Sequence, residues 1–525
     1  MSKSIIRSTI GVSAVIFLSR LFGLLRNTLI ASLFGTSAVA SALQVAQAIP
    51  YLFRRVLGES ALDAFFVPVY SDYKHNKELS TVNAFISNVI TVISLVVIGI
   101  VIVAVVAMPI VILLFAGGLK TSSPEAFGFA IHLARIMMPF MLAVSLMAIF
   151  MGIFNANRNF MLPATNALVL DIALIAVLFL GFVKSISLET LGELVAYSFL
   201  AGGFFILFYQ YHVLKRKYHF RYTFVCQPRE PGMKRIFTMM MPAIGGMAVV
   251  HVNLVVDSLI ASFISEGAIA IIRYAEMFIQ FPIGVIGIAV FNTALPALTT
   301  AVIEKDASTT SDRFNRLLRF IFFLGFPMSA GLIAVRHEMI RAFYQYKNFT
   351  SSDTDAVASV LMYFTIGLVG YFGVRIVSTL FYAYEDVKTP FKVGIAAVIV
   401  NIALCLMFVY LFRMGVEGLA LASSIASLVN IITLIRIAHT RYVRVELHDL
   451  YSAVMKSALA SLLMFAAVWM LSRVLVATSI LGRVGVLAAL VTAGAGVFAV
   501  CCVLMKSAEF KEISGPFMRR FFPVK

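Results

Sequence analysis

The sequence has few charged residues and almost no tryptophan. Only 13% of its 525 residues are Asp, Glu, Lys or Arg and one is Trp, whereas 61% are hydrophobic. The mean hydropathy is +0.97. Soluble globular domains carry roughly 25% charged residues. The composition therefore excludes an ordinary water-soluble fold and predicts an all-α polytopic membrane protein.

The sequence also lacks the common signatures of catalysis. It contains no GxxxxGK[ST] loop, no HExxH zinc motif and no GxSxG elbow. Its four cysteines have neither metal-type spacing nor a disulfide framework. An intramembrane enzyme acting on lipid would need an acidic metal cluster or a histidine with an acid near the membrane surface, and we find neither. The residues leave open a carrier powered by a gradient and an ion channel. We expect a transporter, not an enzyme, with no metal and no resident cofactor.

Long apolar runs cover most of the chain. A span needs about 20 apolar residues, and the first such run carries charges and no cleavage pattern, so we expect a retained helix and not a signal peptide. Fourteen candidate spans are predicted at 8–34, 40–69, 83–116, 127–154, 161–183, 190–213, 236–264, 268–298, 314–335, 355–383, 391–412, 416–435, 455–476 and 480–505.

Basic residues predict the orientation of these spans. They are concentrated in the segment KRKYHFRYTFVCQPREPGMKR at 215–235 and in the tail at 506–525. Because cytoplasmic loops are enriched in Lys and Arg, we expect both termini on the cytoplasmic side of a bacterial inner membrane. Anionic lipids of that leaflet account for the net charge of +17. Membrane lipids are therefore expected partners and nucleic acid is not.

Two halves of the chain resemble each other. NANRNFMLP, ending at Pro163, is followed by DIALI, and YAYEDVKTP, ending at Pro390, is followed by NIALC. Pro68 and Pro296 repeat nearly the same separation along the chain. Such an offset indicates two six-helix lobes related by a parallel pseudo-two-fold repeat, with two extra C-terminal helices.

The repeat also sets the expected domain limits. The predicted domains are an N-terminal lobe at 1–214, a basic linker at 215–235, a C-terminal lobe at 236–440, and the last two helices with the tail at 441–525.

Charged side chains within the spans are the candidates for function, because each is expensive at that depth. Basic residues outnumber acids there, and such a site is suited to an external anion, especially phosphate or diphosphate. The basic set is Arg20, Arg26, Arg54, Arg55, Arg135, Arg273 and Arg375, and the acids are Glu59, Asp63, Asp171, Asp257 and Glu276.

Structural roles remain open for several of these side chains. Arg55 and Glu59 have the spacing of a helical ion pair, and Arg135 and Arg273 lie where a side chain can reach the headgroups. Asp257 is compatible with a cation or proton site, or with a hydrogen bond to Asn253. His132 and His251 are expected to be hydrogen-bonded structural groups.

A series of motifs is similar to the MurJ (MviN) lipid II flippases of the MOP exporter superfamily. The resemblance covers the first twelve spans nearly end to end, whereas the last two match in number and position more than in sequence. The motifs, in chain order, are SRLFGLLR, IPYLFRRVLGE, FVPVYSDY, GIFNANRNFMLP, VNLVVDSLIASF, FPIGVIGIA, FYAYEDVKTP and GVEGLALASS.

The resemblance implies a substrate and a mechanism. The substrate would be undecaprenyl-diphosphate-linked disaccharide pentapeptide, carried from the inner to the outer leaflet. Arg20, Arg26 and Arg54 would hold the diphosphate in a cationic cavity beside Glu59. The last two spans would form a groove for the polyprenyl tail. The lobes would rock between inward-open and outward-open states, driven by the membrane potential with or without sodium or proton coupling.

The sequence departs from the family pattern in the cationic cavity. Met277 stands where the family has an arginine, and Arg273, one turn earlier, is a candidate replacement. Ser41 and Ala48 stand where the family has an acid and a lysine.

It also departs at the sodium site that some members contain. Asp257 and Asn401 match that site, but Cys405 replaces a carboxylate, so sodium binding is doubtful. The departures leave two alternatives open, an exporter of another polyprenyl-linked oligosaccharide and a non-transporting scaffold. A monomer is expected to be sufficient.

Overall fold

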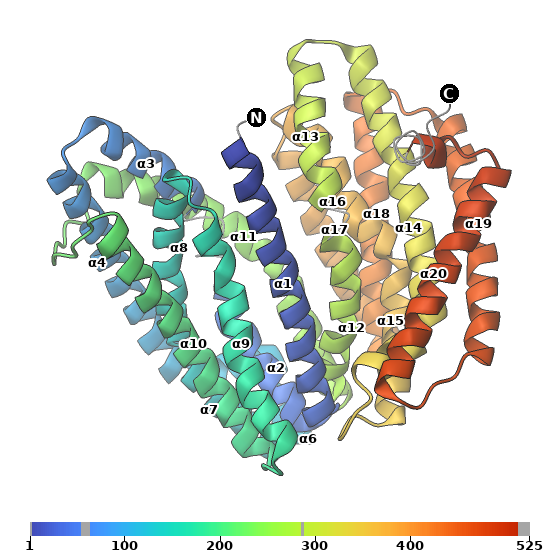
Figure 1. Ribbon diagram of the computed structural model, residues 1–525, viewed down its shortest axis with the longest axis horizontal. Coiled ribbons are helices and arrows are strands. Elements are labelled where there is room, and N and C mark those ends of the chain that lie inside the picture. Colours follow the sequence, from blue (N-terminus) through green and yellow to red (C-terminus); the bar gives the residue numbers. More distant parts are fainter. Residues whose placement is uncertain (1–2, 54–62, 285–287, 513–525) are drawn as a thin grey trace. The chain divides into compact units, whose positions relative to one another are not determined.

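The computed structural model describes residues 3–53, 63–284 and 288–512 of the chain. These residues form helices joined by short connections, with no strand among them. They divide into two compact units, Met1–Ala270 with Tyr346–Phe349, and Ile271–Gln345 with Thr350–Lys525 (Figure 1). The predicted all-α class is confirmed. The predicted domain limits stay a prediction.

The helices of the first unit run from the N-terminus to α11. Side chains cap several of them: Ser37 accepts the backbone N–H of Ala40 at the start of α2, and Ser187 and Glu230 accept those of Thr190 and Met233 at the starts of α10 and α11. The helices are α1 (Lys3–Phe34), α2 (Ala38–Phe53), α3 (Asp63–Asn76), α4 (Leu79–Val106), α5 (Met108–Ala116), α6 (Leu119–Ser122), α7 (Pro124–Met137), α8 (Phe140–Ala156), α9 (Met161–Val183), α10 (Leu188–Lys217) and α11 (Pro231–Ile264).

The second unit contains most of α12 and the helices that follow it. Thr350 and Asp353 form a capping box at the start of α15, and Ser479 caps α20. The elements are α12 (Ala268–Pro282), α13 (Ile288–Ile303), α14 (Ala307–Phe343), α15 (Ser351–Ile366), α16 (Leu368–Ala383), α17 (Lys388–Leu406), the π-helix η3 (Met407–Leu411), α18 (Val416–Arg441), α19 (Leu447–Val474) and α20 (Ile480–Leu504).

Eleven helical segments of the described chain are long and apolar enough to cross a membrane. Three shorter apolar helices occur at Ala38–Leu52, Val252–Ile264 and Thr293–Ile303. Large apolar side chains cover the outside, as at Phe17, which is 67% exposed, and Leu481, which is 86% exposed. Such surfaces are suited to lipid, so a multi-pass membrane protein is confirmed. The count of fourteen spans stays a prediction.

Three predicted spans each contain a break between two helices, although Pro124–Ala156 and Ser351–Ala383 each still count as one segment able to cross a membrane. The span at 83–116 breaks at Ala107 and the span at 127–154 breaks at Met138, in each case just before a proline. Proline has no N–H to continue the preceding helix. The span at 355–383 breaks at Gly367, where an added Cβ would lie 2.5 Å from the Cα of Ser424. A close approach to α18, which glycine alone permits, thus interrupts this helix.

Within the first unit, α9 lies between α1 and α10. Phe140 of α8 packs on Phe199 of α10 with ring centroids 4.2 Å apart, and an added Cβ at Gly203 would lie 2.3 Å from Phe140. These contacts hold α8 and α10 together, and α10 in turn supports α9. The face of α9 that meets α1 is therefore fixed from behind by a packed aromatic core.

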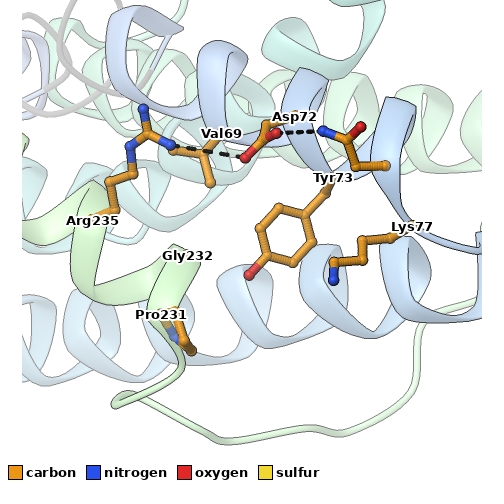
Figure 2. Close-up of a pocket in the computed structure, with 8 residues that line it drawn as sticks. Val69, Asp72, Tyr73, Lys77, Pro231, Gly232 and Arg235 are labelled. Carbon is orange, nitrogen blue, oxygen red and sulfur yellow. Dashed lines mark hydrogen bonds and ion pairs between the residues drawn. The ribbon is translucent and has the colours of Figure 1, made fainter.

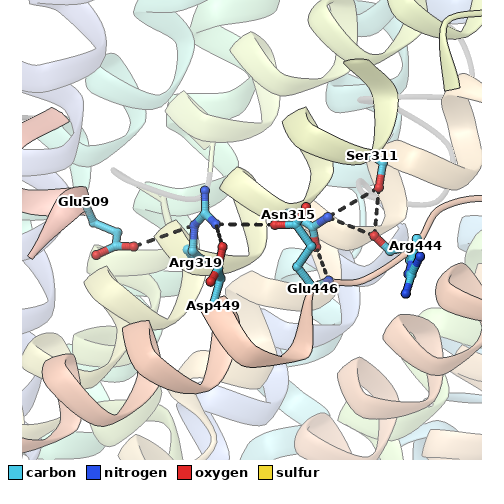
Figure 3. A network of polar contacts seen from close by, with 7 residues as sticks. All are labelled: Ser311, Asn315, Arg319, Arg444, Glu446, Asp449 and Glu509. Carbon is cyan, nitrogen blue, oxygen red and sulfur yellow. Dashed lines mark hydrogen bonds and ion pairs between the residues drawn. The ribbon is translucent and has the colours of Figure 1, made fainter. Parts of the chain in front are cut away.

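Within the second unit, α14 packs along both α19 and α20. At the C-terminal end of α14, Arg483 of α20 donates to the carbonyl oxygen of Gln345 at 3.1 Å. At its N-terminal end, Arg319 lies 3.5 Å from Asp449 of α19 and 3.7 Å from Glu509, which follows α20 (Figure 3). Polar contacts thus join α20 and its continuation to α14 at both ends.

The same network fixes the connection between α18 and α19. The amide of Asn315, which is 3% exposed, donates to the carbonyl oxygen of Arg444 at 2.9 Å and accepts the backbone N–H of Glu446 at 3.0 Å (Figure 3). Ser311 donates to the same carbonyl at 2.8 Å. The backbone groups of this turn are therefore satisfied by α14.

Candidate functional site

Gly23 lies at the contact between α1 and α9. An added Cβ at this position would lie 3.4 Å from Oδ2 of Asp171, so the carboxylate sits directly over the glycine. Both helices belong to the first unit, where α1 follows the length of α9 (Figure 1). The glycine of the motif SRLFGLLR thus lies in van der Waals range of a carboxylate from α9.

Arg26 is held by that carboxylate. Its Nη1 lies 2.6 Å from Oδ1 of Asp171, and the two side chains are 21% and 7% exposed. Its Nε and Nη2 donate to Oδ1 of Asn27 at 3.3 and 3.2 Å. A carboxylate from a second helix therefore offsets the charge of this guanidinium, which the sequence placed among anion-binding candidates. The anion-binding role itself stays a prediction.

Arg20 differs from Arg26 in its surroundings. It is exposed, and it makes no hydrogen bond or ion pair within the described part of the chain. Arg20 and Arg26 are six positions apart, which places the two side chains about 120° apart around an ideal helix. Of the two arginines on α1, Arg20 is therefore the more available for an external anion.

Two further predicted site residues, Arg54 and Glu59, lie outside the described residues. The same holds for Arg55, the alternative partner of Glu59. Their proposed roles rest on the sequence.

In α12 the predicted replacement arginine is already paired. Nη1 of Arg273 lies 2.7 Å from Oε2 of Glu276, three residues later in the same helix. Met277, where the family pattern has arginine, receives the hydroxyl of Tyr344 at 3.6 Å from its sulfur. Tyr344 is fully buried and also contacts Tyr274. Position 277 is therefore packed against the end of α14 by a thioether, a group that suits an aromatic neighbour.

Ser41 and Ala48, which differ from the family pattern in the second predicted span, both lie on α2. Ser41 is fully buried, and its Oγ accepts the backbone N–H of Ala270 at 3.3 Å. Serine thus satisfies a backbone donor near the start of α12. Ala48 is half-buried on the same helix.

The predicted coupling residues lie in two different helices. In α11, Nδ2 of Asn253 donates to Oδ2 of Asp257 at 3.3 Å, which confirms the predicted hydrogen bond. In α17, Asn401 and Cys405 are 1% and 0% exposed. Among the described residues, no group of three or more His, Cys, Asp or Glu could hold a metal ion.

Other membrane-depth side chains have structural contacts. Arg135 donates from Nε to the carbonyl oxygen of Val105 at 3.2 Å. Nε2 of His132 lies 3.1 Å from Oε1 of Glu193, and its predicted hydrogen-bonded role stays a prediction. Arg375 is exposed on α16, and the side chain of His251 lies outside the described part of the structure.

A small cleft of about 260 Å³ lies where α3 meets the start of α11 (Figure 2). Tyr73 donates from its hydroxyl to Glu230, the residue that caps α11, and Arg235 lies 3.9 Å from Asp72. Burial, followed by this hydrogen bond, raises the pKa of Tyr73 to about 12. These contacts tie α3 to the end of the basic linker.

Sequence patterns missed the partner of Arg26. Asp171 lies far along the chain on another helix, and its place among the intramembrane acids did not identify which cation it meets. The sequence offers one signal, Gly23 between two arginines, because glycine permits a bend or a close approach, but it does not name an approaching group. Asp72 and Arg235 were missed because neither lies in an apolar run.

Comparison with known proteins places the chain in a family. The family described as "Lipid II flippase MurJ" matches residues 30–491. The "Probable lipid II flippase MurJ" of Rickettsia prowazekii is 30% identical over 430 residues, covering 82% of each chain. The "Lipid II flippase MurJ" of Burkholderia cenocepacia is 30% identical over 431 residues, covering 81% of this chain and 82% of its own.

Solved structures agree with the sequence relatives. "Lipid II flippase MurJ, inward closed conformation" superposes with a TM-score of 0.79 at 26% identity, covering 96% of this chain and 99% of its own. An inward-facing MATE family transporter of the MOP superfamily shares the fold, with a TM-score of 0.67 at 15% identity and coverage of 82% and 98%. With the family match over residues 30–491 and relatives that are 30% identical over four fifths of their length, this chain belongs to the MurJ lipid II flippase family.

Proposed function

We propose that this protein moves lipid II from the inner to the outer leaflet of the bacterial inner membrane by alternating access. The observation that carries the proposal is the pair of guanidiniums on α1, with Arg20 exposed and Arg26 held ready by Asp171. Two cations kept at membrane depth on one helix of a lipid II flippase family member are suited to a lipid-linked diphosphate.

The chemical task explains why arginine is needed. A diphosphate crossing hydrocarbon unaided would lose its hydration, which is prohibitive for a charged group. Fixed guanidiniums replace that hydration with charge-assisted hydrogen bonds. Arg54 and Glu59 join this site by family resemblance, and Arg273 is the candidate for the contact that Met277 does not make. The sugars and peptide would travel in the hydrated cavity while the polyprenyl chain stays in lipid.

The proposal includes a membrane arrangement. The eleven long segments and three shorter apolar helices together support fourteen spans in two six-helix lobes, followed by α19 and α20. The basic linker and tail support cytoplasmic N- and C-termini. The exposed apolar surface of α19 and α20 supports a groove for the polyprenyl tail. One chain contains both lobes, so we propose a functional monomer.

For energy coupling we propose the membrane potential, because an inside-negative potential favours outward movement of negative charge. Sodium is a hard cation that takes oxygen ligands, and the buried thiol of Cys405 is a poor substitute for a carboxylate. Asp257, hydrogen-bonded to Asn253, remains the candidate for proton or conformational coupling, and Asn401 in α17 is the second position that matches the sodium site of some family members.

The test is rescue of a bacterial strain depleted of its own lipid II flippase, with membrane levels of every variant measured. We expect the wild type to rescue growth and Arg20→Ala to lose rescue, because an exposed cation on α1 is removed. Arg135→Ala is the matched control, since Arg135 contacts the carbonyl oxygen of Val105, and it should still rescue.

Two outcomes would overturn parts of this proposal. A wild-type protein that reaches the membrane without rescuing growth would remove lipid II as the cargo. Rescue by Arg20→Ala equal to the wild type would remove the cationic site on α1. Met277→Arg extends the test, because improved rescue would show that the missing arginine limits transport.

A further inference from the structure

The guanidinium of Arg26 makes hydrogen bonds with only some of its N–H groups. An arginine has five N–H donors, and three of them are used, one toward Asp171 and two toward Asn27. The contact with Asp171 runs from one nitrogen to one oxygen and is not the two-bond fork of which the pair is capable. An incoming anion can therefore meet remaining N–H groups before the carboxylate leaves.

Asp171 is held beside Arg26 by the packing of its helix, so it stays in place when an anion binds Arg26. It is 7% exposed and lies over Gly23, on a helix that is packed against α10. Because the carboxylate belongs to the same unit, its effective concentration beside Arg26 stays high after any exchange.

We propose that Asp171 is the exchangeable counter-ion of Arg26, which yields the guanidinium to the diphosphate and reclaims it on release. This inference rests on the proposed function and names the residue that regulates its binding site. Asp171 is a positioning residue, because it acts on the diphosphate through Arg26.

The exchange makes the cycle reversible. An unpaired guanidinium at this depth would be costly, and it would hold a diphosphate tightly once bound. With Asp171 present, the diphosphate gains only the difference between its own contacts and those of the carboxylate. A carrier that binds its substrate equally tightly in every conformation releases it slowly. A carrier that binds its substrate more tightly in one conformation than in another can capture and then release it.

The first experiment measures binding of farnesyl diphosphate, a short polyprenyl diphosphate, to the purified full-length protein in lipid nanodiscs. Asp171→Asn keeps the size of the side chain and removes its charge. We expect binding roughly tenfold tighter than for the wild type, a change of about 1.4 kcal/mol. Glu193→Gln is the matched control, because Glu193 also pairs between helices of the first unit, and it should bind like the wild type. Unchanged or weaker binding by Asp171→Asn would overturn the proposal.

A double-mutant cycle tests whether Asp171 acts through Arg26. In an Arg26→Gln background, Asp171→Asn should no longer tighten binding, since no guanidinium is left to release. Tightening that persists without Arg26 would show that Asp171 acts directly on the ligand, against the proposal.

A second variant tests the proposal if Asp171→Asn protein folds poorly. Gly23→Val leaves both charges in place and fills the space beside Oδ2 of Asp171. By displacing the carboxylate it should tighten binding in the same direction by a smaller factor. Binding as weak as that of the wild type, in folded Gly23→Val protein, would contradict the exchange.

Transport then separates this inference from the proposed function. In proteoliposomes, Asp171→Asn should lower both the half-saturating substrate concentration and the maximal rate, a combination that a general folding defect does not produce. If the wild type fails to rescue growth but the double-mutant cycle gives the expected binding changes, lipid II is not the cargo and the exchange between Asp171 and the diphosphate still holds. If the wild type rescues growth but Asp171→Asn does not change binding, lipid II remains the cargo and the proposed exchange is wrong.

Discussion

Two ion pairs of almost equal length occupy very different positions in this molecule. Arg26 and Asp171 join α1 to the distant helix α9 at 2.6 Å, whereas Arg273 and Glu276 lie three residues apart within α12 at 2.7 Å. Asp171 is 7% exposed and Glu276 is 32% exposed. Equal distances therefore conceal different environments, which decide what each pair contributes.

The two pairs also differ in the structure that each one needs in order to form. The pair in α12 needs only one turn of helix, so it forms wherever that helix forms. The pair between α1 and α9 needs a packed α9 and two helices brought together beside Gly23. A change in helix packing can therefore open the second pair without affecting the first, which suits it to a site that must exchange ligands.

The largest expected effect is on the pair between helices. Arg26→Leu takes this cation away from the nearly buried Asp171, and we expect it to lower the free energy of unfolding by about 3 kcal/mol. The double variant Arg26→Leu with Asp171→Leu removes both charges and should recover most of that loss. Denaturant unfolding in mixed micelles measures both. Equal destabilisation in the single and double variants would show that packing, not charge, dominates this contact.

The two pairs also differ in how far the sequence predicts them. Spacing of three residues on one helix makes a pair between Arg273 and Glu276 an ordinary expectation, and the contact from Asn253 to Asp257 was predicted on the same local grounds. The partner of Arg26 depends on the tertiary approach of α9, which hydropathy cannot specify. Local composition thus predicts spans and intrahelical contacts, while packing decides contacts between helices.

The helix breaks follow the same rule. Breaks before Pro109 and Pro139 have a signal in the sequence, because proline lacks an N–H. The break at Gly367 depends on Ser424, whose hydroxyl donates to the carbonyl oxygen of Tyr363 at 2.6 Å and so satisfies a backbone group at the break. Ser424 lies on α18, far along the chain from this glycine, and no local pattern identifies it.

An intermediate effect is expected in the network at the start of α14. Arg319→Met leaves Glu509, which is 8% exposed, with the hydroxyl of Ser507 at 2.8 Å as a remaining donor. We expect a loss of about 1 to 2 kcal/mol in the free energy of unfolding. Arg316→Met, one turn earlier, is the control, because Arg316 and Glu512 are 60% and 41% exposed. A loss in the control as large as in Arg319→Met would contradict the importance of burial.

A smaller effect is expected in α12. Glu276→Gln removes a charge that is one-third exposed, so the free energy of unfolding should fall by about 0.5 kcal/mol. Measured beside Arg26→Leu, this variant tests whether the pair within one helix is the weaker of the two. A loss above that of Arg26→Leu would reverse the comparison.

The smallest effect should come from a charge outside the membrane, at the cap of α14. Asp306 accepts hydrogen bonds from the hydroxyl and the N–H of Thr309 at 2.6 and 2.9 Å, and from the hydroxyl of Ser308 at 2.7 Å. These bonds lower the pKa of Asp306 from 3.8 to about 2. Because the unfolded chain takes up this proton first, the stability that the cap supplies is present above pH 3.8 and is lost as the pH falls toward 2. Asp306→Asn should therefore show a shallower fall in melting temperature than the wild type over that range, and parallel curves would mean that the cap contributes nothing to acid stability.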